Sequence, residues 1–132
     1  MDKPIVRRPD LLYPELSYKI LGALFDVANE LGYQYKEIHY QRAVAQRFND
    51  LGISFESQPS VPILFQSKII GRYFFDFLID GKIILELKRG DNFSKKDIEQ
   101  VIGYLKSKNI KLGILARFSP KGLITKRIIN EY

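Results

Sequence analysis

The sequence predicts an α/β protein, a small sandwich in which helices pack on both faces of a mixed β-sheet. Two segments with apolar residues every three or four positions come first, and strand-like runs rich in Ile, Phe and Tyr follow. A further helical segment then precedes a run that is almost entirely apolar. This interleaving of helical and strand patterns is typical of helices that cover a sheet.

Length and composition favour one globular domain over residues 1–132. The chain is 45% hydrophobic and 27% charged, and it has no Cys, which excludes a disulfide framework and a Cys-ligated metal. Residues 1–14 contain three prolines and are expected to form an extended arm. No apolar run approaches the ~20 residues that span a bilayer, and the basic, Pro-containing N-terminus lacks the apolar region of a signal peptide. We therefore expect a cytoplasmic protein with no membrane partner.

Three helices are expected. Residues Glu15–Leu31 repeat apolar side chains at helical spacing up to Gly32, and the pattern over Lys36–Leu51 stops at Gly52. The third helix begins after Ser94, because Ser is a favoured N-cap residue. Its expected buried face consists of four apolar residues: Ile98, Val101, Ile102 and Leu105.

Strands are expected between and after these helices. The long run Ile69–Ile79 and the run Lys82–Lys88 flank Asp80-Gly81, a strong hairpin signal. A short strand, Ile63–Phe65, precedes them, and Pro59 and Pro62 restrict that region to a loop or an edge strand.

Two segments near the C-terminus complete the expected sheet. Leu112–Phe118 is nearly all apolar, which favours a central strand covered on both faces. Gly122–Ile129 has the pattern of a last strand or of a short helix, and the sequence leaves both open.

Charge is distributed unevenly along the chain. Residues 1–81 carry nine basic and ten acidic side chains, whereas residues 82–132 carry twelve and five, a net of +7. Such an excess indicates a polyanionic partner, most simply nucleic acid, although a lysine-rich solvated surface explains it equally well. The candidate contacts to backbone phosphates are lysines: Lys95, Lys96, Lys106, Lys108 and Lys111.

Charged residues also interrupt the two strands of the expected hairpin. Asp76 lies within an aromatic and aliphatic run, and Glu86 and Lys88 alternate with apolar residues in the next strand. Because strand side chains alternate between faces, Glu86 and Lys88 share one face, roughly 7 Å apart along the backbone. Asp76 and Glu86 become near neighbours across the hairpin if a bulge or a wider loop absorbs an offset of one residue.

Two carboxylates and a lysine in one cluster suit phosphodiester chemistry with a hard divalent cation, Mg²⁺ or Mn²⁺. Such a cation binds carboxylate and phosphate oxygens and lowers the pKa of its bound water. The lysine would orient that water or stabilise the charge that develops on the phosphorane. The alternative is a solvent-facing strand surface that carries a simple salt bridge.

The set of motifs resembles the PD-(D/E)xK nuclease superfamily. Asp76 followed ten residues later by Glu86-Leu87-Lys88 resembles its signature. Gln100 and Tyr104, on one face of the next helix, resemble the Q-x-x-x-Y element of RecB-type members. Upstream, Glu37-Ile38-His39-Tyr40 resembles the E-x-x-Y of the GxxExxY proteins, a bacterial and archaeal branch of that superfamily.

The resemblance covers about residues 20–129, with further matches at Gly81-Lys82, at Tyr104-Leu105-Lys106 and over 112–115. It departs from the family pattern at Gln34, where the branch has its first glycine, and at Phe75, where many members have proline. The resemblance implies a restriction-endonuclease-like core.

The resemblance also implies roles for individual residues. Asp76 and Glu86 would be direct metal ligands, Lys88 the catalytic lysine and Glu37 the third carboxylate. Glu37 could equally be an exposed first-turn residue favoured by the helix dipole.

Four further residues near these motifs are ambiguous. Gln100 and Tyr104 would hold the lysine, the ligands or a substrate phosphate, or else form a helix–sheet contact. Tyr40 is better explained as a core residue than as a partner of a ligand. His39 faces about 100° away from its neighbours on the helix and is left out of the mechanism.

These observations lead to one principal function and two alternatives. The principal hypothesis is a Mg²⁺-dependent nuclease that cleaves nucleic acid, DNA rather than RNA, by a metal-activated water. The first alternative is a non-catalytic nucleic-acid-binding or interaction protein that retains the nuclease fold. The second is a homodimer paired through an Ile- and Phe-rich sheet edge, in which the charges are structural. Motifs for zinc, a P-loop, a Rossmann nucleotide site or a Ser-His-Asp triad are absent from the sequence.

Overall fold

The computed structural model describes residues 12–90 and 92–131, so most of the expected N-terminal arm lies outside the described residues. The elements in chain order are α1 (Pro14–Leu31), α2 (Glu37–Asp50), β1 (Phe55–Ser57), β2 (Ser60–Phe65), β3 (Lys68–Phe74), β4 (Phe77–Ile79), β5 (Ile83–Arg89), α3 (Lys95–Lys108), β6 (Leu112–Ser119) and β7 (Gly122–Ile129). In the part of the chain so described, no helix is long and apolar enough to cross a membrane.

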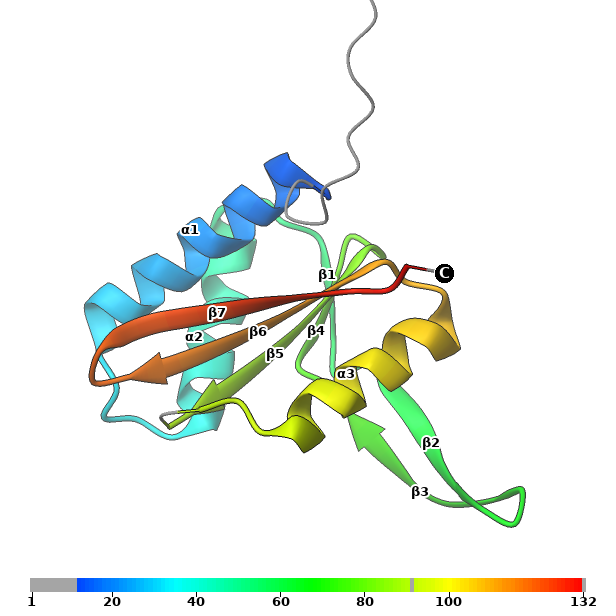
Figure 1. Cartoon of the computed structure of the whole chain (residues 1–132). Helices are drawn as coiled ribbons and strands as arrows, with labels where there is room; N and C mark the ends of the chain where they lie inside the picture. Colours follow the sequence, from blue (N-terminus) through cyan, green and yellow to red (C-terminus); the bar gives the residue numbers. More distant parts are fainter. Residues whose placement is uncertain (1–11, 91, 132) are drawn as a thin grey trace, which may run out of the picture.

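The main sheet has five strands in the order β1-β4-β5-β6-β7. β5 and β6 run parallel, and every other neighbouring pair is antiparallel, so the sheet is mixed. α3 makes the crossover between the two parallel strands, as such a connection requires. Figure 1 shows α1 and α2 on one face of the sheet and α3 on the other. The predicted αβα sandwich, as in a restriction-endonuclease-like fold, is confirmed.

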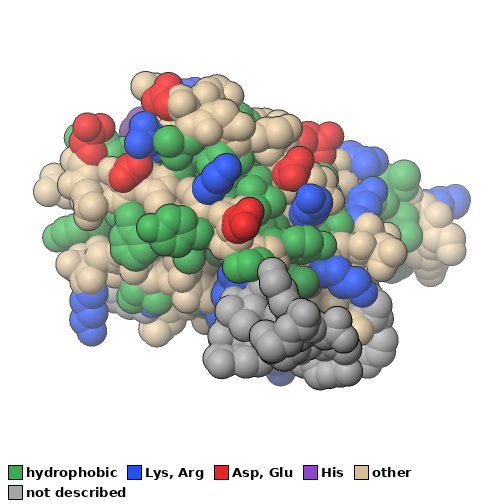
Figure 2. Space-filling view, turned by 90° about the horizontal axis from the view of Figure 1, so that it is seen from above, with side chains coloured by type: hydrophobic (Ala, Val, Ile, Leu, Met, Phe, Trp, Pro, Cys, Tyr) green, Lys and Arg blue, Asp and Glu red, His purple; other side chains and the backbone are tan. Residues whose placement is uncertain are grey.

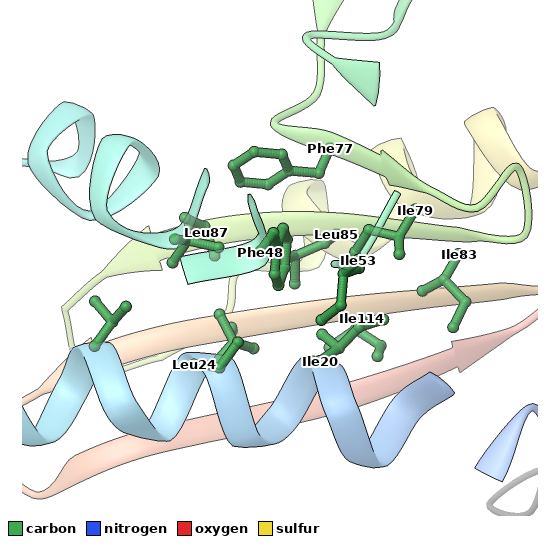
Figure 3. Close-up of a cluster of buried hydrophobic side chains, with 14 of the residues drawn as sticks. Ile20, Leu24, Phe48, Ile53, Phe77, Ile79, Ile83, Leu85, Leu87 and Ile114 are labelled. Carbon is green, nitrogen blue, oxygen red and sulfur yellow. The ribbon is translucent and has the colours of Figure 1, made fainter. Parts of the chain in front are cut away.

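Two hydrophobic clusters hold the three layers together. The larger one joins α1 and α2 to one face of the sheet, where Leu24 and Phe48 meet Leu85 (Figure 3). The smaller one joins α3, through Val101 and Leu105, to the opposite face. β5 contributes to both clusters because its side chains alternate between the faces.

The predicted helices and C-terminal strands agree with the structure to within a residue or two. Ser94 caps α3 by accepting a hydrogen bond from the backbone N–H of Asp97 at 3.0 Å. All eight residues of β6 are buried, as expected of a central strand. The segment 122–129 is a strand, which decides between the two alternatives that the sequence left open.

The prediction of one continuous strand over Ile69–Ile79 is wrong. The chain leaves β3 at Phe74 and enters β4 at Phe77, and the two strands belong to different sheets. At the break, the backbone N–H of Phe75 donates to the carbonyl of Pro59 at 2.8 Å instead of continuing a ladder. Asp76 therefore lies in a bend, where its polar groups have partners that a strand would not give them.

β2 is longer than expected and pairs only with β3, as a two-stranded ribbon. Pro62 lies within β2, which agrees with the predicted edge strand, since a strand in mid-sheet would need its N–H. The three-residue strand β1 was not predicted, because Phe55-Glu56-Ser57 is too short to show a period.

The turn between β4 and β5 brings Asp76 opposite Glu86. Asp80 and Gly81 both have positive φ, 51° and 66°, and the paired residues that flank the loop are Ile79 and Ile83. The loop is one residue wider than the two-residue hairpin, so Lys82 absorbs the offset. A conformation with positive φ at both positions explains the Asp-Gly sequence.

Candidate active site

Two hydrogen bonds from backbone N–H groups join Asp76 to the strand that carries Glu86. The backbone N–H of Asp76 donates to Glu86 Oε1 at 3.0 Å, and the backbone N–H of Leu87 donates to Asp76 Oδ2 at 2.7 Å. The prediction that the two carboxylates are neighbours across the hairpin is confirmed. Glu86 lies in the C-terminal half of β5 and shares the α3-facing side of that strand with Ile84.

The other oxygen of each carboxylate accepts a hydrogen bond from a neighbouring element. Gln41 Nε2, on α2, donates to Asp76 Oδ1 at 2.6 Å. The Tyr73 hydroxyl, on β3, donates to Glu86 Oε2 at 2.9 Å. All four carboxylate oxygens are thus held in place, by three elements and the bend.

Sequence reasoning missed both Gln41 and Tyr73. Gln41 follows Glu37 by four positions, so helical spacing on the face of the expected third carboxylate could have found it. Tyr73 gave no usable signal, because it precedes Asp76 by three positions. In a continuous strand such a pair would point to opposite faces, and only the bend at Asp76 brings them together.

Burial shifts the acid–base properties of the pair. Glu86 is only 5% exposed, and desolvation, followed by the charge of Asp76 and a hydrogen bond with it, raises the pKa of Glu86 to about 8. Tyr73 and Lys88 oppose that shift without cancelling it. Burial, together with the charge of Glu86 and the hydrogen bond to it, likewise raises the pKa of Tyr73. Glu86 therefore favours its protonated form at neutral pH when no cation is bound.

Lys88 follows Glu86 on the same face of β5, but its direct partner is on α3. Its Nζ lies 3.5 Å from Asp97 Oδ1, and both side chains are largely shielded. Although burial works against ionisation, hydrogen bonds from Ser94 and the charge of Lys88 hold the pKa of Asp97 below its usual range. Asp97 thus anchors the lysine beside the carboxylate pair.

Arg117 is a second cation next to Lys88, and the sequence gave no reason to select it. It lies opposite Lys88 in the β5–β6 register and is 6% exposed. Its Nη1 donates to the carbonyl of Gly90 at 2.9 Å, and its guanidinium lies 5.1 Å from the centroid of the Phe93 ring. Its buried Nε has no partner in the described structure. Arg117 therefore fixes the segment that leads from β5 into α3.

Glu37 is not gathered with the pair. It is exposed at the start of α2, one turn before Gln41. Across residues 12–90 and 92–131, no three His, Asp or Glu side chains lie close enough together to hold a metal ion. The structure thus brings together two of the three carboxylates that the sequence nominated.

The remaining nominated residues lie around the pair rather than in it. Tyr104 is buried on α3 and packs edge-on against Phe75, with 4.7 Å between ring centroids. Gln100, half-buried on the same helix, makes no hydrogen bond to the pair in the described structure. Tyr40 donates its hydroxyl to the carbonyl of Gly32 at 2.6 Å and stacks on Phe118, which supports its interpretation as a core residue. His39 is exposed and accepts the backbone N–H of Lys36, so its contact is a helix cap.

The candidate phosphate-binding lysines do not form one patch. Lys95 and Lys96 occupy the first turn of α3, next to Asp97, whereas Lys106 and Lys108 occupy its last turn. Lys111 follows the helix. Figure 2, a view of the molecule from above Figure 1, shows acidic and basic side chains interspersed over the face turned to the viewer. The lysines therefore define two separate basic ends of α3.

The residues present fit a hard divalent cation. Glu86 is a buried carboxyl group, Asp76 beside it is partly shielded, and the neighbouring Lys88 is engaged by Asp97. Within the described part of the chain, the two carboxyl groups therefore have no cationic side chain as a dedicated partner. Carboxylate oxygens are the ligands that Mg²⁺ and Mn²⁺ prefer.

The sandwich and its carboxylate pair place the protein among the nuclease-like α/β folds. The family model described as the PD-(D/E)XK nuclease superfamily matches residues 14–128. The chain belongs to this superfamily, which confirms the superfamily part of the resemblance found in the sequence.

Other comparisons are less informative. The crystal structure of SSO0001 covers 90% of this chain and 79% of its own, with 15% sequence identity and a TM-score of 0.46. No curated protein matches the chain significantly.

Proposed function

We propose that the protein is a metal-dependent nuclease that hydrolyses phosphodiester bonds in nucleic acid, with DNA as the substrate. The observation that carries the proposal is the pair Asp76 and Glu86, with Lys88 on the same strand face. Membership of a nuclease superfamily supports this chemistry.

Asp76 and Glu86 would hold Mg²⁺ or Mn²⁺, whereas Glu37, exposed at the start of α2, lies apart from this pair and is left out of the set. When bound, the cation would supply Lewis acidity at the phosphate and an acidified water. Gln41 and Tyr73 orient the carboxylates, since each donates to one of their oxygens. Glu86 must release its proton before both carboxylates can act as anionic ligands.

Lys88 would act beside the cation rather than bind it, because an ammonium has no lone pair. Asp97, whose Oδ1 lies 3.5 Å from Lys88 Nζ, would hold the lysine in place, and the charge of Lys88 would act on the attacking water or the developing phosphorane. Gln100 and Tyr104, on the same helix as Asp97, would support this arrangement or contact a substrate phosphate. Lys95, Lys96, Lys106 and Lys108 would contact the nucleic-acid backbone.

The test is cleavage by the purified protein of labelled single-stranded, duplex, nicked and branched DNA, and of RNA. We expect products with Mg²⁺ or Mn²⁺ that EDTA and Asp76→Ala both abolish. DNA should be cleaved in preference to RNA of the same sequence. Absence of metal-dependent cleavage on every substrate would overturn the proposal.

A non-catalytic nucleic-acid-binding protein is the second candidate. The observation in its favour is that every oxygen of the pair already accepts an internal hydrogen bond. Such a protein would bind nucleic acid in a salt-dependent way, indifferent to EDTA and to Asp76→Ala. Metal-dependent cleavage decides against it.

We also propose that residues 1–132 form one nuclease-like domain of the GxxExxY branch. Both hydrophobic clusters pack on the same sheet, which supports a single domain. Glu37 and Tyr40 support the branch through its E-x-x-Y element, although Gln34 replaces its first glycine.

A further inference from the structure

The β2–β3 ribbon, Ser60–Phe74, exposes an unusual amount of apolar surface. Within the described residues, it carries half of the large hydrophobic side chains that are exposed. These six residues are between 44% and 66% exposed: Ile63, Leu64, Phe65, Ile69, Ile70 and Phe74. Figure 1 shows the ribbon projecting from the body of the molecule beyond α3.

Both faces of the ribbon are apolar. Leu64 and Ile69 are cross-strand partners on one face, and Ile63 and Phe65 point to the other, because strand side chains alternate. Ile70 lies at the bulge where the register shifts. Neither face of the outer ribbon is covered, since only its base packs against the α3 cluster, through Val61 and Tyr73.

A ribbon of this kind needs a partner. An isolated two-stranded hairpin is marginally stable in water unless further strands or a helix cover it. The six half-exposed side chains offer roughly 500 Å² of apolar surface. That area is at the upper end for a patch on a monomer and approaches the ~800 Å² that each partner buries in a standard interface.

The composition of the ribbon favours protein rather than nucleic acid as the partner. Its only charged residues are Lys68 and Arg72, and charge depletion with aliphatic enrichment is typical of homodimer interfaces. A ribbon that reads a DNA groove needs hydrogen-bonding side chains, and a lipid-binding segment needs a denser basic rim. Arg72 is also engaged within the ribbon, where its Nε donates to Ser60 Oγ at 2.9 Å.

We propose that the β2–β3 ribbon is a dimerisation arm that packs against the same ribbon of a second copy of this chain about a two-fold axis. A second copy of the chain can provide the partner that the apolar ribbon needs. In a two-fold interface the same patch of both copies meets, so one self-complementary patch is sufficient. The other six exposed large apolar residues of the described chain lie on α1, on α2 and in the segments beside these helices, outside the ribbon. The proposal does not depend on nuclease activity.

The first test is sedimentation equilibrium of the full chain between about 1 and 100 μM. Wild type should sediment as a dimer, and the double variant Leu64→Gln/Ile69→Gln should weaken self-association at least 30-fold. Phe25→Gln is the matched control, because Phe25 is 48% exposed on α1, away from the ribbon, and should leave the dimer unchanged. Circular dichroism verifies folding, which both variants should retain because these side chains lie outside the two clusters.

A second test uses the absence of cysteine from the chain. On a denaturing gel, a bifunctional maleimide should crosslink Leu64→Cys into covalent dimers and should leave Phe25→Cys uncrosslinked, although both variants self-associate. A monomeric wild type up to 100 μM, or an unchanged dimer in the double variant, would overturn the proposal. If a monomeric wild type bound anionic vesicles or DNA and the double variant did not, the arm would be a lipid-binding or nucleic-acid-binding element instead.

Discussion

Asp76 and Lys88 contribute to the site in different ways, and substitution should separate them. Lys88→Ala should lower the cleavage rate by two orders of magnitude or more, about 3 kcal/mol of transition-state stabilisation, because its charge acts on the reacting groups. Its metal affinity should change little, since both carboxylates remain. Asp76→Ala should lose cleavage and metal binding together. Single-turnover cleavage and calorimetric titration with Mn²⁺ measure the two effects.

Lys82→Ala is the matched control for Lys88→Ala. Lys82 precedes β5 and pairs with Asp80 at 3.5 Å, but both side chains are about half exposed in the turn. The Lys82→Ala variant should cleave at the wild-type rate. Near-wild-type cleavage by Lys88→Ala beside an inactive Asp76→Ala would show that the lysine takes no part. Loss of stability in both variants, with no activity in wild type, would make the cluster structural.

The raised pKa of Glu86 predicts how metal-free stability depends on pH. The folded protein holds a proton on Glu86 up to about pH 8, whereas an unfolded chain releases it near 4.5. Because the folded state binds the extra proton, its stability should fall by up to about 1.4 kcal/mol per pH unit between these values. This contribution is complete below the lower value and is lost as the pH rises through about 8.

Urea unfolding in EDTA at pH 5, 6, 7 and 8 measures that slope, and Glu86→Gln should flatten it. Metal affinity should move in the opposite direction and rise with pH up to about 8, because binding must displace the proton. A wild-type slope equal to that of Glu86→Gln would mean that folding does not raise the pKa of Glu86.

At the scale of elements, the contact between α3 and β6 depends on a glycine. A Cβ atom at Gly113 would lie 2.5 Å from Val101 Cγ1, and the β-branched valine cannot easily move aside. Gly113→Ala should therefore destabilise the protein by about 1–3 kcal/mol through overpacking. Chemical denaturation measures the destabilisation, and the midpoint should fall with little change in its slope.

Gly103→Ala makes the same chemical change on the facing helix, but it should have the opposite effect on the stability of the protein. No atom lies within 4 Å of a Cβ atom placed at Gly103. Because glycine is unfavourable inside a helix, alanine should stabilise α3 by roughly 0.5–1 kcal/mol. Destabilisation by both substitutions would indicate that the close approach at Gly113 is not the cause.

The sequence predicted those elements whose patterns arise from burial on one face or on both. β6 and the three helices are examples, because a continuous apolar run or a helical period marks them directly. The split between β3 and β4 could not be predicted, since the aromatic run continues through Phe75 without interruption. What divides it is the engagement of Phe75 and Asp76 with distant backbone groups.

The candidate site likewise contains residues that local sequence patterns predict and residues that they do not. Asp76, Glu86 and Lys88 lie on one hairpin, so local alternation was enough to bring them together. Asp97 and Arg117 come from α3 and β6, and their positions depend on the packing of three elements. Local patterns do not encode such contacts.

For the whole molecule, residues 82–132 carry a net charge of +7, and two pairs of their lysines lie at opposite ends of α3. The first turn, with Lys95 and Lys96, lies beside Asp97 and therefore near Lys88. The last turn lies at the opposite end of a 14-residue helix, about 20 Å away at 1.5 Å per residue. Proximity to the carboxylate pair, rather than total charge, should decide which lysines a short substrate contacts.

Neutralising each end separately tests this expectation. Lys95→Gln/Lys96→Gln should weaken binding of a short oligonucleotide and reduce the slope of log affinity against log salt by up to about 2, because each lysine would neutralise about one phosphate. Lys106→Gln/Lys108→Gln removes the same formal charge and should change that slope much less. Fluorescence anisotropy with catalytically inactive Asp76→Ala, in EDTA between 50 and 200 mM salt, measures both. Equal reductions of this slope in the two double variants would show that net charge alone attracts the nucleic acid. The lysines near the carboxylate pair would then have no special part in binding.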